Sequence, residues 1–296
     1  MSAADATYLD LGGLAVRVRV SGPQDGPPVL LLHGIGRSLE DWVPAHDLLA
    51  REHRVVSMDL PGFGLTRRAK GRPGLAGFAR AVVGVLDALD ERRPVYLMGN
   101  SLGGAVAMTV AVAHPGRVAG LVLAGSAGFG REANVPVLPM AYALLSAAPV
   151  VGGRFRPRAR RAGAQVNRDL FFDPAHATEE MIRHAGTVGR QPDFRATFLG
   201  TALSLGVPLL GTYPGWRRRL LTALAEARIP TLVLWGDADT VLPAHHLTAA
   251  LVALPHARGH LLTATGHLPQ IERAGELTAL AAGFIRDTEA ADRSAA

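Results

Sequence analysis

The sequence predicts an α/β fold with a mostly parallel sheet of about eight strands, flanked by helices. Three observations carry this prediction. Strand-like and helix-like segments alternate at both ends of the chain, which is typical of parallel strands joined by helices. Several predicted strands are unbroken apolar runs, as expected of strands buried on both faces. A chain of 296 residues with 48% apolar residues can also bury a large core without disulfides, and it contains no cysteine.

The first predicted elements are strands separated by one helix. Residues 7–20 alternate between apolar and polar side chains around a Gly-Gly pair, which predicts an antiparallel hairpin at the sheet edge. The apolar run at 29–32 predicts a buried strand. A helical stretch near 40–52 then leads to a further strand at 54–58.

The next segments continue the alternation. Apolar residues recur at helical spacing through 75–91, which predicts a helix. Residues 94–98 form another buried apolar run, and 102–113 follow as a helix that ends before Pro115. Residues 118–124 are predicted as one more strand.

The regular pattern stops near residue 128 and resumes beyond residue 218. The intervening stretch of about 90 residues holds eight prolines and short helical pieces, and it is far too long for a connecting loop. We therefore expect a core made of 1–128 and 219–296, with a helical cap subdomain inserted at 129–218.

The C-terminal part returns to the α/β pattern and ends in a predicted frayed tail. Its predicted elements are a strand at 231–235, a helix at 243–254, a strand at 259–264, a helix at 268–285 and the tail at 287–296.

The chain carries more basic than acidic residues. The formal net charge is +6, and Lys70 is the only lysine among 31 basic residues. The arginines are spread along the chain among 25 acidic residues, which indicates a compositional bias, so we expect no nucleic-acid partner. The densest basic cluster comprises Arg154, Arg156, Arg158, Arg160 and Arg161.

No basic start followed by an apolar run opens the chain, and no apolar stretch is long enough to span a bilayer. An apolar segment at 135–151 beside the basic cluster could touch an anionic membrane surface, but its prolines break a regular helix. We therefore expect a cytoplasmic protein without membrane contact.

Ser101 is the candidate nucleophile. It lies in Gly-Asn-Ser-Leu-Gly-Gly, between a predicted buried strand and a predicted helix. A serine on such a turn is held in a strained backbone conformation that lifts its Oγ above the sheet edge. Gly99 and Gly103 remove side chains that would collide in so tight a turn. A glycine-rich phosphate-binding turn is the alternative, but no lysine or acid adjoins it.

A serine hydroxyl needs a base to take its proton and a carboxylate to orient that base. His267 directly follows a predicted strand and opens the last helix, so we assign it as the base. Asp239 is the favoured acid, because it lies further along the loop after residue 235 than Asp237 and can bend back over the sheet edge. Asp237 then caps the turn, although it could replace Asp239. The order Ser, Asp, His differs from that of other serine-protease folds.

The oxyanion that forms on the substrate carbonyl needs preorganised donors. We expect the N–H of Leu102, at the helix start, and the N–H of Ile35, in the loop after the strand at 29–32. His33, at the end of that strand, is expected to hold the loop by a hydrogen bond and not to act as a base.

Five motifs in this order resemble an α/β-hydrolase-fold enzyme with a cap domain. They are His-Gly-Ile-Gly at 33–36, Asp-Leu-Pro-Gly-Phe-Gly-Leu-Thr at 59–66, the Ser101 turn, the segment 235–243 and Gly-His at 266–267. The resemblance covers about 8–128 and 219–286. It implies that the segment at 59–66 shapes a turn and does no chemistry. It also disfavours halide or epoxide opening, because those relatives carry an aspartate nucleophile.

The resemblance implies a serine hydrolase that cleaves a carboxylic ester or a related acyl substrate, with no metal or cofactor. The turn around Ser101, with Gln270 and Glu272 after the histidine, is also similar to hydrolases that cleave carbon–carbon bonds in ring-fission products. Those relatives commonly carry a Trp after the catalytic His, where this chain has Leu268. They also use a cap arginine to hold the substrate carboxylate, which Arg190, Arg195 or the arginine cluster at 154–161 could supply. A lyase, cyclase or acyl-transfer enzyme and a ligand receptor also stay open.

The expected partner is a small apolar acyl-type substrate, and a homodimer is left open. The apolar residues at 135–151 are expected to form the cap core. Alternatively, some of them line a hydrophobic substrate tunnel together with the cap phenylalanines Phe171, Phe172, Phe194 and Phe198.

Overall fold

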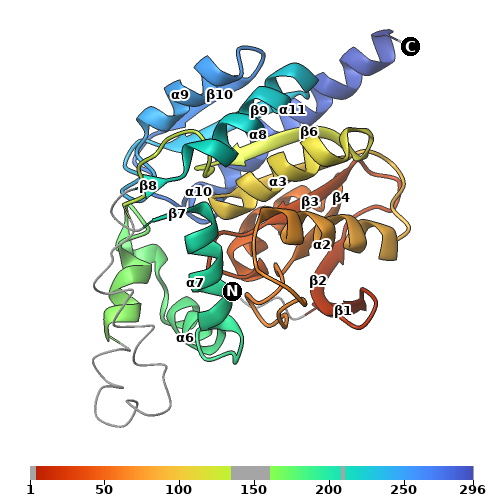
Figure 1. Cartoon of the computed structure of the whole chain (residues 1–296). Helices are drawn as coiled ribbons and strands as arrows, with labels where there is room; N and C mark the ends of the chain where they lie inside the picture. Colours follow the sequence, from red (N-terminus) through yellow and green to blue (C-terminus); the bar gives the residue numbers. More distant parts are fainter. Residues whose placement is uncertain (1–4, 135–160, 208–210, 296) are drawn as a thin grey trace.

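The computed structural model describes residues 5–134, 161–207 and 211–295. In this part of the chain, a mixed sheet of eight strands has the order β1-β2-β4-β3-β5-β6-β9-β10 (Figure 1). Its strands are β1 (Thr7–Asp10), β2 (Ala15–Ser21), β3 (Pro28–Leu32), β4 (Arg54–Met58), β5 (Val95–Asn100), β6 (Val118–Ala124), β9 (Thr231–Gly236) and β10 (Arg258–Leu262). Only β1 and β2 pair antiparallel with their neighbours, so the predicted edge hairpin and mostly parallel sheet are confirmed.

Helices cover both faces of the sheet, as the apolar central strands require. The core helices are α1 (Val43–Leu49), α2 (Leu75–Ala88), α3 (Leu102–Ala113), α8 (Pro214–Ala227), α9 (His245–Ala253), α10 (Pro269–Glu272) and α11 (Ala274–Ala295). A short 3-10 turn, η1 (Leu39–Trp42), precedes α1. One apolar cluster joins the sheet to α2, α3, α8 and α9, and a second joins the opposite face to α1 and α11.

The described residues of the predicted cap, called the cap below, are mainly helical and lie at one end of the core (Figure 1). It contains a short 3-10 turn, η3 (Pro174–His176), the helices α6 (Glu179–Val188) and α7 (Phe194–Leu205), and the paired strands β7 (Gly206–Val207) and β8 (Gly211–Thr212). The predicted boundary between 218 and 219 falls within α8, which packs on α3 of the core.

The two ends of this insertion lie beside each other. The Thr212 N–H donates to the Arg131 carbonyl at 2.9 Å, and the Thr212 hydroxyl donates to the Gly130 carbonyl at 3.1 Å. The Arg217 guanidinium donates to the carbonyls of Gly128 and Phe129 at 3.0 and 2.9 Å. The chain therefore leaves the core and returns to it at nearly the same place.

Two C-terminal predictions are wrong in detail. The predicted helix at 268–285 is divided into α10 and α11, because Arg273 leaves the helical backbone region. The predicted frayed tail at 287–296 is helical as far as Ala295. Its alanines, its glutamate and its single arginine have high helix propensity, and Thr288 is buried, so α11 continues past the sheet.

Other predictions concern residues outside the described part of the chain. They include the apolar segment at 135–151 and four of the five clustered arginines, those at 154, 156, 158 and 160. Among the described residues, no helix combines the length and the apolar character that crossing a membrane would require.

Candidate active site

Ser101 occupies the strained turn that the sequence predicts. It has φ 53° and ψ −116° between the last residue of β5 and the first residue of α3. Positive φ is costly for a residue with a side chain, so the surrounding packing must hold the turn in place. Ser101 is only 9% exposed, and its own N–H donates to the carbonyls of Ala124 and Gly125 at 3.3 and 3.2 Å.

The flanking glycines are required by close backbone approach. A β-carbon at Gly99 would lie 2.4 Å from the Gly103 carbonyl carbon, and one at Gly103 would lie 2.2 Å from the Leu32 carbonyl oxygen. Both contacts are with backbone atoms, which cannot move aside as a flexible side chain could. The glycines thus allow α3 to begin directly against the end of β3.

His267 and Asp239 form a buried pair at the ends of neighbouring loops. His267 Nδ1 lies 2.8 Å from Asp239 Oδ2, and their side chains are 6% and 0% exposed. Asp239 Oδ1 accepts from the N–H groups of Val241 and Leu242, both at 2.9 Å. These bonds fix the carboxylate, which in turn orients the imidazole with Nε2 available for another partner.

Asp237 has a different role in the same loop. Its Oδ1 accepts from the Thr265 N–H at 3.2 Å, so it joins the loop after β9 to the segment that leads to His267. The sequence predicts that Asp237 caps its own turn, but its described hydrogen bond runs to Thr265 on another segment, while Asp239 lies against His267.

Several contacts bring the Ser101 turn and the His267 loop to the same sheet edge. Asn100 Nδ2 donates to the His267 carbonyl at 2.9 Å. A β-carbon at Gly125, whose carbonyl accepts from Ser101, would lie 3.3 Å from Asp239 Oδ2 and 3.6 Å from His267 Nδ1. Within the described residues, the Ser101 hydroxyl makes no hydrogen bond. A hydrogen bond between Ser101 and His267 is therefore part of the proposed mechanism and not a contact of this structure.

The two expected oxyanion donors flank this edge. Leu102 begins α3, and Ile35 follows Gly34, at which a β-carbon would lie 3.4 Å from Ser101 Cβ. In the described ranges, neither the Leu102 N–H nor the Ile35 N–H donates to a protein acceptor. Both donors therefore remain available to a substrate oxygen.

His33 holds the Ile35 loop, as predicted. Its Nδ1 donates to the Gly34 carbonyl at 2.7 Å, and its Nε2 accepts from the Leu60 N–H at 2.9 Å. Complete burial lowers the pKa of His33, which favours the neutral ring that this pattern requires. With both nitrogens occupied, His33 has no capacity left to act as a base.

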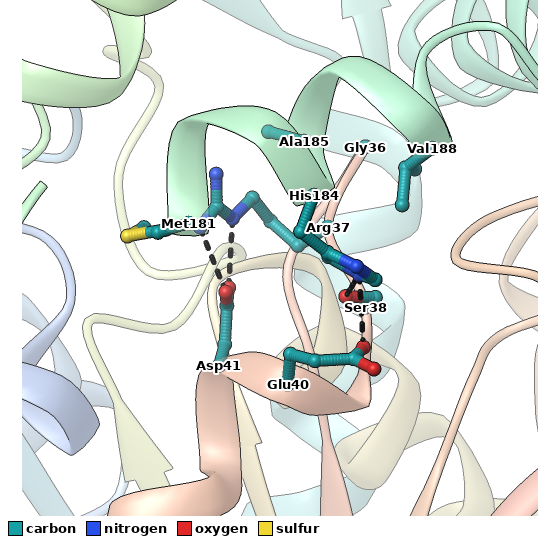
Figure 2. Close-up of a pocket in the computed structure, with 9 residues that line it drawn as sticks. All are labelled: Gly36, Arg37, Ser38, Glu40, Asp41, Met181, His184, Ala185 and Val188. Atoms are coloured by element: carbon teal, nitrogen blue, oxygen red, sulfur yellow. Dashed lines mark hydrogen bonds and ion pairs between the residues drawn. The ribbon is translucent and has the colours of Figure 1, made fainter. Parts of the chain in front are cut away.

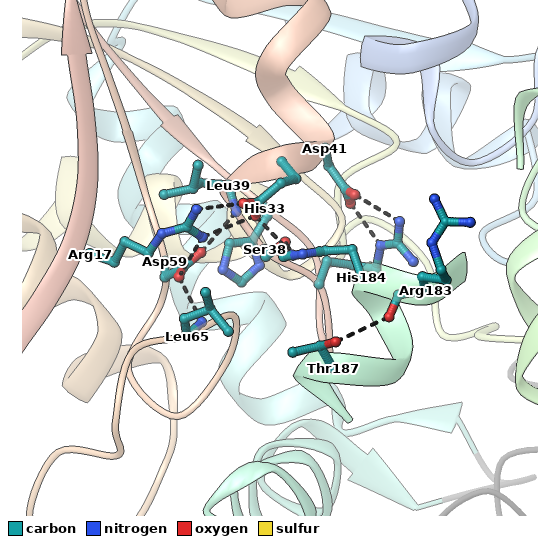
Figure 3. Close-up of polar contacts among 12 residues, drawn as sticks. Arg17, His33, Ser38, Leu39, Asp41, Asp59, Leu65, Arg183, His184 and Thr187 are labelled. Atoms are coloured by element: carbon teal, nitrogen blue, oxygen red, sulfur yellow. Dashed lines mark hydrogen bonds and ion pairs between the residues drawn. The ribbon is translucent and has the colours of Figure 1, made fainter. Parts of the chain in front are cut away.

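A buried polar network lies behind this loop (Figure 3). Asp59 accepts from the N–H groups of Leu39 and Leu65 at 2.9 and 2.8 Å, which explains how its segment shapes the turn. Arg17 lies 3.6 Å from Asp59 and donates to both oxygens of Glu40 at 2.6 and 3.2 Å. Burial would raise the pKa of Glu40, but hydrogen bonds from His184 and Arg17 hold it well below its ordinary value.

The cap contacts the outer side of the same loop (Figure 2). His184 on α6 lies 3.0 Å from Glu40 and 2.9 Å from the Ser38 hydroxyl. Arg37 is bidentate to Asp41 at 2.7 Å and donates to Asn167 of the cap. These residues border a small cleft between α6 and the loop. This network cannot be predicted from the sequence, because residues bonded to each other in it are separated by up to 146 positions.

The cap residues singled out in the sequence are not gathered at one place. Phe198 is buried, and a β-carbon at Gly36 would lie 3.2 Å from its ring, so α7 packs on the Ile35 loop. Phe194 packs against Phe198 in a tilted arrangement, at a ring-centroid distance of 5.8 Å. Phe171 is buried, whereas Phe172 is 55% exposed.

Two of the candidate cap arginines, Arg190 and Arg195, lie in the described part of the cap. Arg190 and Arg195 are exposed, and Arg190 donates to Thr187 on α6. Neither of the two pairs with a residue of the Ser101 turn or of the loops that carry Asp239 and His267.

Known proteins resemble the chain in sequence and in fold. The sequence model of the alpha/beta hydrolase fold matches residues 27–274. The chain is 32% identical over 277 residues to the dihydrolipoyllysine-residue acetyltransferase component of the acetoin cleaving system of Pseudomonas putida, covering 94% of this chain and 68% of that protein. It is 28% identical over 284 residues to 2-hydroxy-6-oxo-6-phenylhexa-2,4-dienoate hydrolase of Comamonas testosteroni, covering 94% and 93%.

A solved structure shares the fold. The esterase RhEst1 of Rhodococcus sp. ECU1013 superimposes with a TM-score of 0.75 at 24% identity, covering 95% of this chain and 98% of that one.

Proposed function

Because the chain belongs to the alpha/beta hydrolase fold family, we propose that it is a serine hydrolase that cleaves a carboxylic ester or a related acyl substrate. Ser101 is the nucleophile, His267 the general base and Asp239 the acid that orients it. The observation that supports this most directly is the buried His267–Asp239 pair, 2.8 Å apart, at the sheet edge that carries the strained Ser101 turn.

The reaction follows from these positions. Ser101 Oγ attacks the acyl carbonyl while His267 Nε2 takes its proton, and the imidazolium that forms is stabilised by Asp239. The N–H groups of Ile35 and Leu102 stabilise the oxyanion. His267 then returns the proton to the leaving group, and water releases the acyl-enzyme by the same steps. These steps need no metal or cofactor.

The substrate class, the partners and the cellular location are predictions from the sequence. We expect a small substrate with an apolar acyl body, no nucleic-acid partner, no membrane contact and a cytoplasmic location. The aromatic rings of Phe198, which is buried, and Phe194, which is partly buried, lie beside the Ile35 loop and support an apolar surface near the carbonyl site. A homodimer stays open.

Carbon–carbon bond hydrolysis is the second candidate, because the curated dienoate hydrolase matches along nearly the whole chain. Two features weigh against it. Leu268 stands where such enzymes commonly carry Trp, and Arg190 and Arg195 are exposed without a described contact to the Ser101 turn. The acetyltransferase relative favours acyl chemistry but does not distinguish transfer to water from transfer to another acceptor.

One set of assays separates these functions. A chain-length series of p-nitrophenyl esters is measured beside a ring-fission dienoate, with Ser101→Ala as the test variant and Ser294→Ala, on the exposed end of α11, as the matched control. Ester hydrolysis should fall by up to about a millionfold in Ser101→Ala and stay unchanged in Ser294→Ala. An unchanged ester rate in Ser101→Ala would refute the proposal, and faster turnover of the dienoate than of every ester would favour the second candidate.

A further inference from the structure

Glu272, the last residue of α10, holds two separate backbone segments with one carboxylate. Its Oε2 accepts from the Gly266 N–H at 2.6 Å, directly before His267. Its Oε1 accepts from the N–H groups of Phe172 and Asp173 in the cap, at 2.7 and 3.2 Å. A charged acceptor makes each of these bonds stronger than a neutral one would.

The cap segment 169–173 lies directly on the loops that carry the acid and the base. The His267 N–H donates to the Leu170 carbonyl at 2.7 Å, and the Thr240 hydroxyl donates to the Asp169 carbonyl at 3.2 Å. A β-carbon at Gly266 would lie 2.6 Å from the Leu170 carbonyl oxygen. The backbone of the cap thus touches the base loop with no side chain between them.

Apolar packing anchors the same segment. Phe171 is buried in a small cluster with Leu268, Ile271 and Met181, which joins the cap to α10. Glu272 therefore lies where the cap, α10 and the base loop meet. All three of its hydrogen-bond donors are backbone N–H groups. The carboxylate therefore fixes the position of one backbone segment relative to the other.

We propose that Glu272 is a positioning residue that sets the backbone before His267 and makes the placement of the imidazole depend on the seating of the cap. This inference rests on the proposed function, because it assigns Glu272 to the base of that reaction. Without the carboxylate, the Gly266 N–H loses its acceptor and the base loop loses a hydrogen-bonded link to the cap, while the bond from the His267 N–H to Leu170 and the apolar packing stay. A displacement of the base by about 1 Å can reduce the rate about 100-fold.

The variants are Glu272→Ala and the isosteric Glu272→Gln, with Glu276→Gln as the matched control. Glu276 is an exposed glutamate on α11 that lies 3.5 Å from His260 and touches neither loop. The Gln side chain has a single oxygen, so it can serve Gly266 or the cap but not both. We expect kcat/KM to fall about 100-fold in Glu272→Ala, to fall less in Glu272→Gln and to stay unchanged in Glu276→Gln.

Two further measurements distinguish positioning from general support of the fold. The first is the downfield proton resonance of the His267 Nδ1–H that is hydrogen-bonded to Asp239, which should broaden or disappear in Glu272→Ala well below its melting temperature. The second is the rate of Ser101 labelling by a fluorophosphonate, which should fall in parallel with kcat/KM.

A folded Glu272→Ala protein with the His267 resonance and the labelling rate of the wild type would overturn the inference. If Glu272→Ala does not fold, the same comparison with Glu272→Gln decides. The resonance needs no substrate, so it tests Glu272 even if the wild-type protein proves inactive on every acyl substrate, a result that would refute only the proposed function.

Discussion

Asp239 and His267 face each other across 28 residues of sequence, with Oδ2 and Nδ1 2.8 Å apart and both side chains nearly inaccessible to water. Asp237, only two residues earlier in the same loop, turns instead toward the Thr265 N–H. The loop thus offers two carboxylates of similar chemistry with distinct partners, and this contrast makes a matched pair of variants.

Asp239→Asn should reduce kcat for ester hydrolysis about 10⁴-fold, because an amide no longer stabilises the imidazolium and favours the wrong tautomer. Asp237→Asn keeps an oxygen that can accept from Thr265 and should lose less than tenfold. Steady-state kinetics on one p-nitrophenyl ester measures both. A larger loss in Asp237→Asn would show that the acid has been assigned to the wrong aspartate, and equal losses would contradict the distinct roles of the two.

Gly103→Ala should destabilise the fold by roughly 3 kcal/mol or more, because its β-carbon would lie 2.2 Å from the Leu32 carbonyl oxygen and α3 would have to move away from β3. Gly275→Ala is the control, since a β-carbon there meets nothing within 4 Å. It should change stability by less than about 1 kcal/mol, in the stabilising direction. Urea unfolding followed by circular dichroism checks both, and similar midpoints for the two variants would contradict the packing argument.

His46 should make the protein less stable as the pH falls below neutral. Its ring is fully buried between the hydroxyls of Ser21 and Ser57, each 2.6 Å away, and burial, aided by Arg19, lowers its pKa from 6.5 to about 4. The unfolded chain binds a proton below pH 6.5, whereas the folded chain binds it only near pH 4. The stabilisation by neutral His46 is therefore complete above pH 6.5 and is lost progressively between pH 6.5 and pH 4.

The variant His46→Gln removes this proton linkage. Between pH 7 and pH 4, the free energy of unfolding of the wild type should fall more than that of His46→Gln, by about 3 kcal/mol at most. Urea titrations at half-unit pH intervals measure the difference. Parallel curves for the two proteins would mean that His46 titrates near its ordinary pKa in the folded state.

His184→Ala should weaken the hold of the cap on the Ile35 loop, because His184 is the α6 residue that contacts both Glu40 and Ser38. The loss of one or two such bonds corresponds to roughly a tenfold fall in kcat/KM. Arg183→Ala is the neighbouring control, since Arg183 is exposed and its side chain lies near Glu179 on the same helix. Identical kinetics for the two variants would show that the contact does not influence the donor loop.

Much of the fold and part of the site could be predicted from the sequence, because both are encoded over short stretches. The apolar run of β3, the glycines around Ser101 and the position of His267 after the last strand each carry their own local signal. Proximity of Asp239 to His267 also follows from the topology, since the ends of parallel strands meet at one sheet edge.

The remaining features depend on packing between distant residues. Glu40 carries no local sign that it pairs with Arg17 and His184, and Glu272 gives no sign that it holds the cap and the base loop together. The extent of α11 also cannot be predicted locally, because the amino acids at its end suit a tail as well as a helix, and the burial of Thr288 is a property of the folded chain.

The meeting of Arg131 and Thr212 has a consequence for how such an enzyme can diversify. Since the two ends of the insertion are already side by side, a longer, shorter or unrelated segment could replace it with little added entropy of loop closure. Chimaeras that exchange this cassette between homologues should keep the scaffold and its reactive groups while acquiring a new range of accepted molecules.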